Sequence, residues 1–109
     1  MIQPRHVPPP GEILIEEFLR PAGLTQVAVA DRLGWTRARL NQVIRGRRAI
    51  SAEAALDLGA LLGTTPQFWM NLQTMYDVDQ AMARRDKARH RYPKPFPPLV
   101  AAERAPKYR

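Results

Sequence analysis

Residues 25–45 read TQVAVADRLGWTRARLNQVIR, and their pattern predicts two short helices joined by a tight turn. Thr25 and Thr36 each stand where a helix would start, and a threonine hydroxyl there accepts a hydrogen bond from a backbone N–H of the first turn. Gly34 stands between the two helices, where the chain has to turn sharply and a residue that tolerates positive φ is needed. This stretch decides the fold, because the packing of its two helices fixes which side chains face outward.

The apolar residues of these helices predict how they pack. Ala30 falls where the second helix crosses the first, and a close crossing needs a small residue. The side chains spaced to bury against one another are Val29, Leu33, Leu40 and Val43. Such packing sets the two helices at a steep angle, which is the geometry of a helix-turn-helix that inserts its second helix into the major groove of DNA.

The outward positions of the second helix are the predicted base-reading residues. They are Arg37, Ala38, Arg39, Asn41 and Gln42. Arginine and amide side chains at such positions can form two hydrogen bonds with a guanine or adenine edge. An ordinary helix hairpin with a solvated basic surface is the alternative, but the small residue, the glycine turn and the inward apolar pair together favour DNA binding.

A second group of residues is predicted to contact the DNA backbone. The first amides of a helix attract anions, and the arginines after the second helix leave it close to the sugar-phosphate chain. The predicted phosphate contacts are Gln26, Thr36, Arg45, Arg47 and Arg48.

The charge of the chain is spread unevenly. The 109 residues hold 17 Lys and Arg against 10 Asp and Glu, a net charge of +7. Residues 32–48 hold six arginines and no acid, and residues 84–109 hold nine bases and two acids, whereas the first 83 residues together are neutral. A balance of this kind points to an acidic partner, with nucleic acid as the first candidate.

The remaining sequence predicts an all-α domain of five helices and no strands. Prolines and Gly23 bracket a first helix, Ser51 is positioned to cap the fourth, and Thr65 with Pro66 starts a longer fifth. We expect an N-terminal arm over 1–9, a helix-turn-helix domain over 10–90 and an extended tail over 91–109.

The fifth helix carries more large apolar residues than one core can take. Its inner side is predicted to hold Phe68, Leu72, Met75 and either Val78 or Asp79. Trp69 and Tyr76 point elsewhere in this arrangement and are therefore the predicted dimer interface, because aromatic residues are enriched in the cores of protein interfaces.

Several classes of function are disfavoured by the composition. The chain has no cysteine, and His6 and His90 stand near opposite ends, so we predict no metal, cofactor or catalytic site. A ribonuclease built from the residue types in ARHRYPK would need a sheet to hold its site, and an RNA-binding module would interleave aromatics with the basic residues. The sequence has no signal peptide pattern and no apolar run of about 20 residues. We therefore expect a cytoplasmic protein without a membrane partner, associated with the nucleoid when bound to DNA.

Three stretches give the chain a resemblance to a known family. They are PGEILIEEFLRPAGLTQ, LNQVIRGRRAIS and ALDLGALLGTTPQFWMNLQTMYDV, and they cover most of residues 9–81. On these stretches the chain resembles the HigA-type antitoxins, a branch of the lambda-repressor-like (XRE) helix-turn-helix superfamily. The combination is specific to this branch, whereas LNQVIRGRR alone would indicate only the superfamily.

The resemblance implies a lambda-repressor-like five-helix fold, a homodimer and the role of antitoxin in a type II toxin-antitoxin pair. It further implies repression of the protein's own operon through double-stranded operator DNA, and a small HigB-like ribonuclease toxin as partner. The base-reading roles carry over to the residues of the second helix named above. A stand-alone repressor without a toxin partner is the alternative, which the neighbouring gene would decide.

The chain departs from the family pattern at three places. HVPPPGE replaces the plain HPGE of many members, and Trp35 replaces a small aliphatic residue in the turn, where it either enlarges the core or faces the DNA. The Pro-rich basic tail is the third departure, with prolines at 93, 95, 97, 98 and 106. Its two candidate uses are a non-specific contact with DNA beside the operator and a docking arm for the toxin. The charge of residues 84–94 favours DNA, and the tip of the tail is left open.

Overall fold

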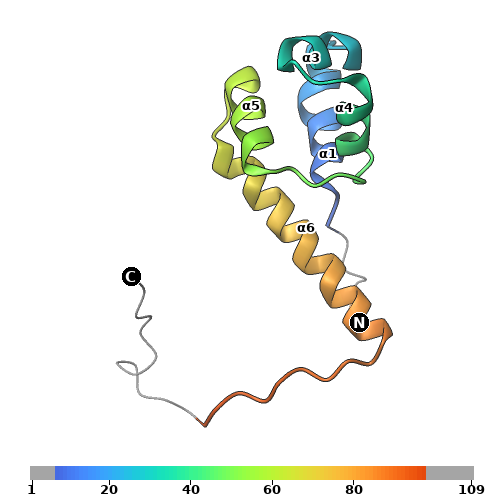
Figure 1. The fold of residues 1–109 in the computed structure, drawn as a ribbon, viewed down its shortest axis with the longest axis vertical. Helices are drawn as coiled ribbons and strands as arrows, with labels where there is room; N and C mark the ends of the chain where they lie inside the picture. Colours follow the sequence, from blue (N-terminus) through green and yellow to red (C-terminus); the bar gives the residue numbers. More distant parts are fainter. Residues whose placement is uncertain (1–6, 98–109) are drawn as a thin grey trace.

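The computed structural model describes residues 7–97, and every regular element in that range is helical. The elements are α1 (Pro10–Ile13), η1 (Leu14–Leu19), α2 (Arg20–Ala22), α3 (Gln26–Leu33), α4 (Arg37–Ile44), α5 (Ala52–Leu62) and α6 (Pro66–Lys87). η1 is a π-helical segment that joins α1 and α2 into one continuous helix, because the backbone keeps right-handed helical angles at both junctions. The described range therefore holds five helices, as predicted (Figure 1). The predicted arm over 1–9 and tail over 91–109 lie partly outside the described residues.

Each helix from α3 onward starts at a hydroxyl residue that caps it. The side-chain oxygens of these residues accept hydrogen bonds of 3.0–3.1 Å from backbone N–H groups three residues on. The capping residues are Thr25, Thr36, Ser51 and Thr65. Gly34 ends α3 with φ at +74°, the left-handed conformation that glycine adopts without steric cost. The predicted starts of the last four helices and the turn between α3 and α4 are thus confirmed.

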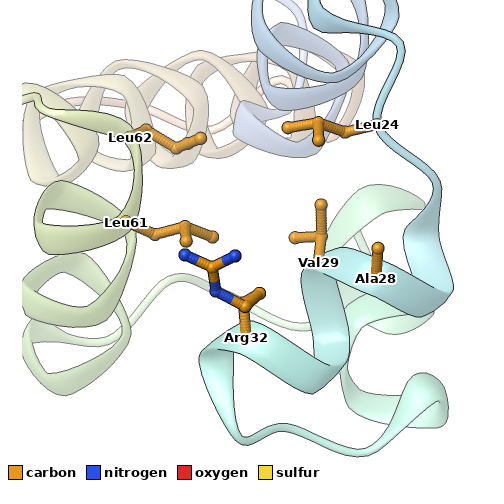
Figure 2. Close-up of a pocket in the computed structure, with 6 residues that line it drawn as sticks. All are labelled: Leu24, Ala28, Val29, Arg32, Leu61 and Leu62. Atoms are coloured by element: carbon orange, nitrogen blue, oxygen red, sulfur yellow. The ribbon is translucent and has the colours of Figure 1, made fainter.

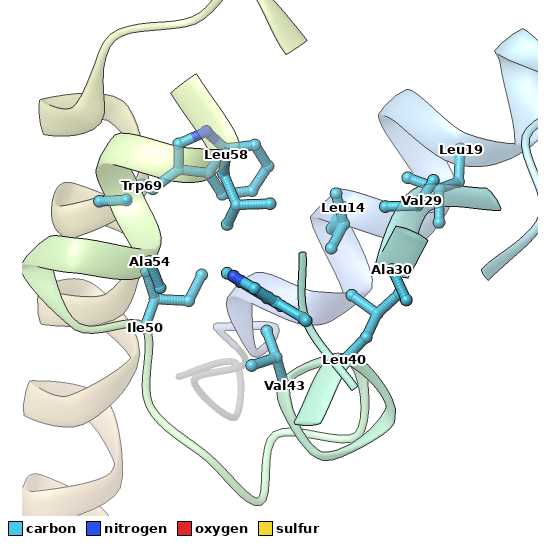
Figure 3. Packing of buried hydrophobic residues seen from close by; sticks show 12 residues of the cluster. Leu14, Leu19, Val29, Ala30, Leu40, Val43, Ile50, Ala54, Leu58 and Trp69 are labelled. Atoms are coloured by element: carbon cyan, nitrogen blue, oxygen red, sulfur yellow. The ribbon is translucent and has the colours of Figure 1, made fainter. Parts of the chain in front are cut away.

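Side chains from all five helices meet in one apolar core (Figure 3). Leu14 of the first helix, Leu40 of α4 and Leu58 of α5 are fully buried there, beside Trp69 of α6. The predicted clamp between α3 and α4 is confirmed for three of its members, since Val29, Leu40 and Val43 are buried, and Leu33 is half-buried at its edge. Ala30 is fully buried at the crossing, as expected for a small residue that lets two helices approach.

Trp35 belongs to the core. Its side chain is 6% exposed, and its indole Nε1–H donates a hydrogen bond of 3.0 Å to Oδ2 of Asp57 on α5. The turn of the helix-turn-helix is thereby joined to the next helix by packing and by a polar contact. Of the two expectations for this tryptophan, the structure supports the enlarged core.

The predicted inner side of α6 is wrong at Phe68 and Met75, which are exposed. It is confirmed at Leu72, which is half-buried against the core, and of the two alternatives Val78 and Asp79 the buried residue is Asp79. Trp69 and Gln73 of this helix are also buried. The helix is rotated because the indole of Trp69 fills the core. It lies 5.3 Å from the ring of Phe18, and its Nε1–H donates a hydrogen bond of 2.7 Å to Oγ1 of Thr64. Periodicity alone did not reveal that the largest side chain of the helix takes the inner position.

No helix among residues 7–97 combines the length and the apolar character that crossing a bilayer requires.

Candidate nucleic-acid interface

The outward surface of α4 is fixed by the two residues that it buries. Leu40 and Val43 are embedded in the core, so the opposite side of this eight-residue helix faces solvent. Of the predicted base-reading residues, Arg37, Ala38 and Gln42 are exposed, and Arg39 and Asn41 are half-buried. The structure therefore brings all five to one accessible helix, and their roles in base reading stay predictions.

Arg39 differs from Arg37 in its surroundings. Its guanidinium carbon lies 4.1 Å from the ring centroid of Trp35, within the range of a cation–π interaction. This contact restricts the conformations of the Arg39 side chain, because its guanidinium lies against the Trp35 ring. Arg37 is exposed at the start of the helix. Arg37 is accordingly the better candidate for reaching a base edge, and Arg39 for a contact at the rim of the groove.

The first helix packs closely against the end of α4 and thereby fixes its position. Gly11 lies so close to the end of α4 that a Cβ atom there would collide with the carbonyl oxygens of Val43 and Ile44. Both neighbours are backbone atoms, which cannot swing away as a side chain does. Sequence alone does not identify this glycine as important, because the close approach of two backbones depends on the folded structure.

The loop after α4 presents three exposed arginines in a defined arrangement. The backbone N–H groups of Arg47 and Arg48 donate to the carbonyl oxygen of Gln42, at 2.8 and 3.2 Å, so the loop folds back over the end of the helix. Arg45 is the C-cap residue of α4. All three predicted phosphate contacts of this loop are exposed, and their role stays a prediction.

A buried glutamine anchors the far end of this loop. Gln73 of α6 accepts a hydrogen bond of 2.7 Å from the backbone N–H of Ile50, and its Nε2 donates one of 2.8 Å to Oδ1 of Asp77. Gln73 is not among the residues predicted from the sequence, since a lone glutamine on a long helix resembles any surface residue. Its position in the structure ties the arginine loop to α6.

The remaining two predicted phosphate contacts lie at helix starts. Gln26 begins α3 and is exposed, and Thr36 precedes α4. The hydroxyl oxygen of Thr36 already accepts the hydrogen bond from the N–H of Arg39, at 3.0 Å. A phosphate contact by Thr36 would therefore use the hydroxyl hydrogen as donor while the cap stays in place.

The cations of α4 and of its loop are available to an external anion. The ion pair between Arg20 and Glu16, at 3.5 Å, lies on the first helix and uses none of these cations. Arg32, the sixth arginine of the basic stretch, lies elsewhere. Its side chain extends across a recess of about 240 Å³ between α3 and α5, toward Leu61 (Figure 2). Arg32 therefore lies outside the predicted DNA-binding surface of α4 and the loop 45–48.

The predicted dimer interface needs one correction. Trp69 is fully buried within its own chain and cannot contact a second chain, so its assignment to the interface is wrong. Tyr76 is half-buried, with its hydroxyl oxygen 3.7 Å from the position of a Cβ atom built on Gly46. Its role in an interface stays a prediction.

Residues 7–97 contain no group of three or more His, Cys, Asp or Glu side chains placed to hold a metal ion.

Comparison with known proteins gives the same fold. A helix-turn-helix family model matches residues 15–69. The chain is 45% identical over 78 residues to "Virulence-associated protein I" of Dichelobacter nodosus, a match that covers 72% of this chain and 70% of that protein. The structure of the Pseudomonas aeruginosa antitoxin HigA with the higBA promoter is similar at 38% identity and a TM-score of 0.73, covering 85% of this chain and 98% of that one. A second Pseudomonas aeruginosa protein structure, in complex with its 18-bp operator DNA, is similar at 37% identity and a TM-score of 0.74, covering 88% and 98%.

Proposed function

The chain belongs to the XRE-type helix-turn-helix family, whose members include HigA antitoxins, and on this premise we propose that it represses its own operon as the antitoxin of a type II pair. Proteins of this family are DNA-binding regulators rather than enzymes. We place the chain in the cytoplasm, bound to operator DNA through α4.

One observation carries the proposal of operator binding. α4 buries Leu40 and Val43 and thereby presents Arg37 and Gln42 to solvent, beside a loop with three further arginines. Long side chains with hydrogen-bond donors, on a helix whose other side is fixed in the core, suit the major groove. There arginine can bond a guanine edge and glutamine an adenine edge. The similar structures that hold operator or promoter DNA support this use of the surface.

The operator proposal is tested on the DNA upstream of the operon that contains the gene. The purified chain should protect a short segment there from cleavage, with nanomolar affinity at physiological salt and far weaker binding to a scrambled duplex. Equal binding to both duplexes would contradict operator recognition.

The toxin partner is the second element of the proposal. It is supported by the names of the relatives, among them "Antitoxin HigA-1" of Vibrio cholerae. Co-expression with the adjacent open reading frame should yield a stable complex and relieve growth arrest caused by that neighbour alone. If the neighbour is harmless and does not co-purify, the chain is a stand-alone repressor.

We also propose that the chain acts as a homodimer through the exposed apolar side of α6. Phe68, Met75 and Val78 lie on that side, and Met75 and Val78 border a recess that Val7 and Thr74 also line. Three large apolar side chains exposed on one side of a 22-residue helix favour contact with another protein surface over contact with water. A second copy is the occupant we favour, because two recognition helices are needed to read a palindromic site.

A further inference from the structure

Six cations gather at the end of α6 and in the segment that follows, and the proposed function uses none of them. We name them the C-terminal basic cluster: Arg84, Arg85, Lys87, Arg89, Arg91 and Lys94. All six are exposed. Residues 84–94 contain a single acid, Asp86, so their net charge is +5.

The chain leaves α6 through an ordered turn. The N–H of His90 donates to the carbonyl oxygen of Arg85 at 2.8 Å, and the N–H of Arg89 donates to that of Asp86 at 3.1 Å. These two bonds, one nested in the other, are the Schellman closure of a helix. The ring of Tyr92 then lies 5.1 Å from the guanidinium carbon of Arg85 and 6.1 Å from the ring of His90. The first residues after the helix are thereby held against its last turn.

Arg89 occupies the position in this turn where glycine is preferred. Its φ is +53°, and it is the non-glycine residue with positive φ in the described part of the chain. The left-handed conformation is sterically costly for a residue with a Cβ atom. Arg89 thus occupies a backbone conformation that glycine would adopt with less strain. Backbone strain of this kind is found more often at functional sites, which points to a role for the Arg89 side chain.

Stabilisation of the helix end does not account for the cluster. Cations in the last turn of a helix do interact favourably with its dipole, which explains Arg84, Arg85 and Lys87. The effect fades within one turn, so it leaves Arg91 and Lys94 unexplained, and at Arg89 the strain opposes it.

The cluster is separated from the arginine loop by a defined length of α6. The arginine loop touches the middle of α6, where Gly46 lies beside the hydroxyl of Tyr76. From Tyr76, α6 continues to Lys87, a rise of about 16 Å at 1.5 Å per residue. That length equals about five base pairs of B-DNA. Figure 1 shows this end of α6 as the part of the described helices farthest from α3.

We propose that the C-terminal basic cluster binds backbone phosphates of double-stranded DNA beside the half-site that α4 reads. The inference rests on the proposed function, because α4 must first hold the chain on its operator. The contact would be independent of base sequence, since it depends on charge and position alone.

The test is a set of binding titrations of the full chain at several salt concentrations. Two duplexes are compared: one ends at the outer edges of the operator, and the other extends it by about ten base pairs on each side, one helical turn. The first variant replaces Arg84, Lys87 and Arg91 by glutamine, which leaves the Arg85–Tyr92 contact and the turn intact. The control is Arg20→Gln, an exposed cation on the first helix.

On the extended duplex, the triple variant should flatten the plot of log affinity against log salt by roughly 0.9 for each phosphate that the cluster no longer neutralises. On the short duplex, it should match the unmodified protein, as should Arg20→Gln on both. Unchanged slopes on the extended duplex would overturn the proposal and leave an acidic protein as the partner of the cluster. An equal reduction on both duplexes would also overturn it, because the contact would then lie inside the operator.

Arg89→Gly provides a second, independent measurement. Glycine relieves the strained φ, so the melting temperature should not fall, while the salt slope on the extended duplex should flatten by roughly 0.9. If Arg89 has only a structural role, Arg89→Gly should leave DNA binding unchanged. That result would remove Arg89 from the cluster. If the unmodified chain does not prefer operator over scrambled DNA, the proposed function is refuted instead. This outcome differs from an unchanged salt slope of the variants, which refutes only the role of the cluster.

Discussion

Arg37 and Arg47 have the same charge but differ in how the backbone presents them. Arg37 projects from the first turn of α4, whose rotation is fixed by two buried residues. Arg47 lies on the loop that folds over the end of that helix. A base edge can be read only by a side chain in a fixed orientation, whereas a phosphate needs only a nearby positive charge.

We therefore expect truncation of the two arginines to have different effects on DNA binding. Arg37→Ala should cost about 1–3 kcal/mol on the operator and reduce discrimination at one base position. Arg47→Ala should weaken binding to all sequences alike and lower the salt slope by roughly 0.9. Anisotropy titrations on operator and scrambled duplexes at several salt concentrations decide this. Identical behaviour of the two variants would mean that the recognition surface is misplaced.

Gly11 allows the second residue-scale prediction. A methyl group at this position would meet the backbone of Val43 and Ile44, so Gly11→Ala should lower the free energy of unfolding by about 1–3 kcal/mol. The shift of α4 that relieves the collision should also weaken operator binding. Gly23→Ala is the control, because its Cβ meets nothing within 4 Å and only the φ of +68° opposes it. Denaturant titration and DNA binding are measured for both, and a Gly11 variant that keeps its operator affinity would contradict the prediction.

At the scale of elements, the loop between α4 and α5 depends on α6. Its last residue before the cap of α5 is Ile50, whose N–H is satisfied by the buried side chain of Gln73. A buried N–H that loses its partner costs about 1–3 kcal/mol. The orientation of the arginine loop is thus linked to α6 through the side chain of Gln73.

We expect Gln73→Ala to destabilise the protein by about 1–3 kcal/mol and to weaken DNA binding, because the loop loses its anchor. Gln67→Ala is a matched control. Gln67 also bonds a residue four positions on, Asn71 at 2.8 Å, but it is exposed and holds no backbone group. Its removal should cost about 0.2–0.5 kcal/mol. Thermal unfolding of the two variants measures the difference, and equal shifts would show that the bond to Ile50 contributes nothing.

The elements also show what the sequence could predict. Caps such as Thr25 and Thr36 act within three residues, and the α3–α4 clamp depends on local spacing, so both were predictable. The rotation of α6 was not, because it depends on Trp69 finding space beside Phe18, a contact across some fifty positions of the chain. For the same reason, the sequence placed the predicted base-reading residues on one helix but gave no sign of Gly11 packed against that helix or of the contact of Arg39 with the ring of Trp35.

At the scale of the whole molecule, the correction to α6 moves the expected dimer interface. With Trp69 buried, the apolar side chains left on the surface of this helix are Phe68, Met75 and Val78. Exposed apolar side chains on one side of a long helix can pair with those of a second copy around a two-fold axis. Two copies joined in this way would present two α4 helices, and we expect their half-site centres about 34–36 Å apart on a palindromic operator.

The exposed side chains of α6 allow a direct test of this assembly. Met75→Glu should convert the dimer to a monomer at micromolar concentration, because a two-fold interface would bring two buried glutamates close together. Leu56→Glu is the control, since Leu56 on α5 is 54% exposed and Met75 is 57% exposed, and both substitutions add the same charge. Light scattering reports the mass, and binding to a full palindrome against a single half-site reports the consequence. The Met75 variant should lose the preference for the palindrome while its melting temperature stays near that of the Leu56 variant. A Met75 variant that remains dimeric would place the interface elsewhere, and a monomeric unmodified protein would refute the dimer altogether.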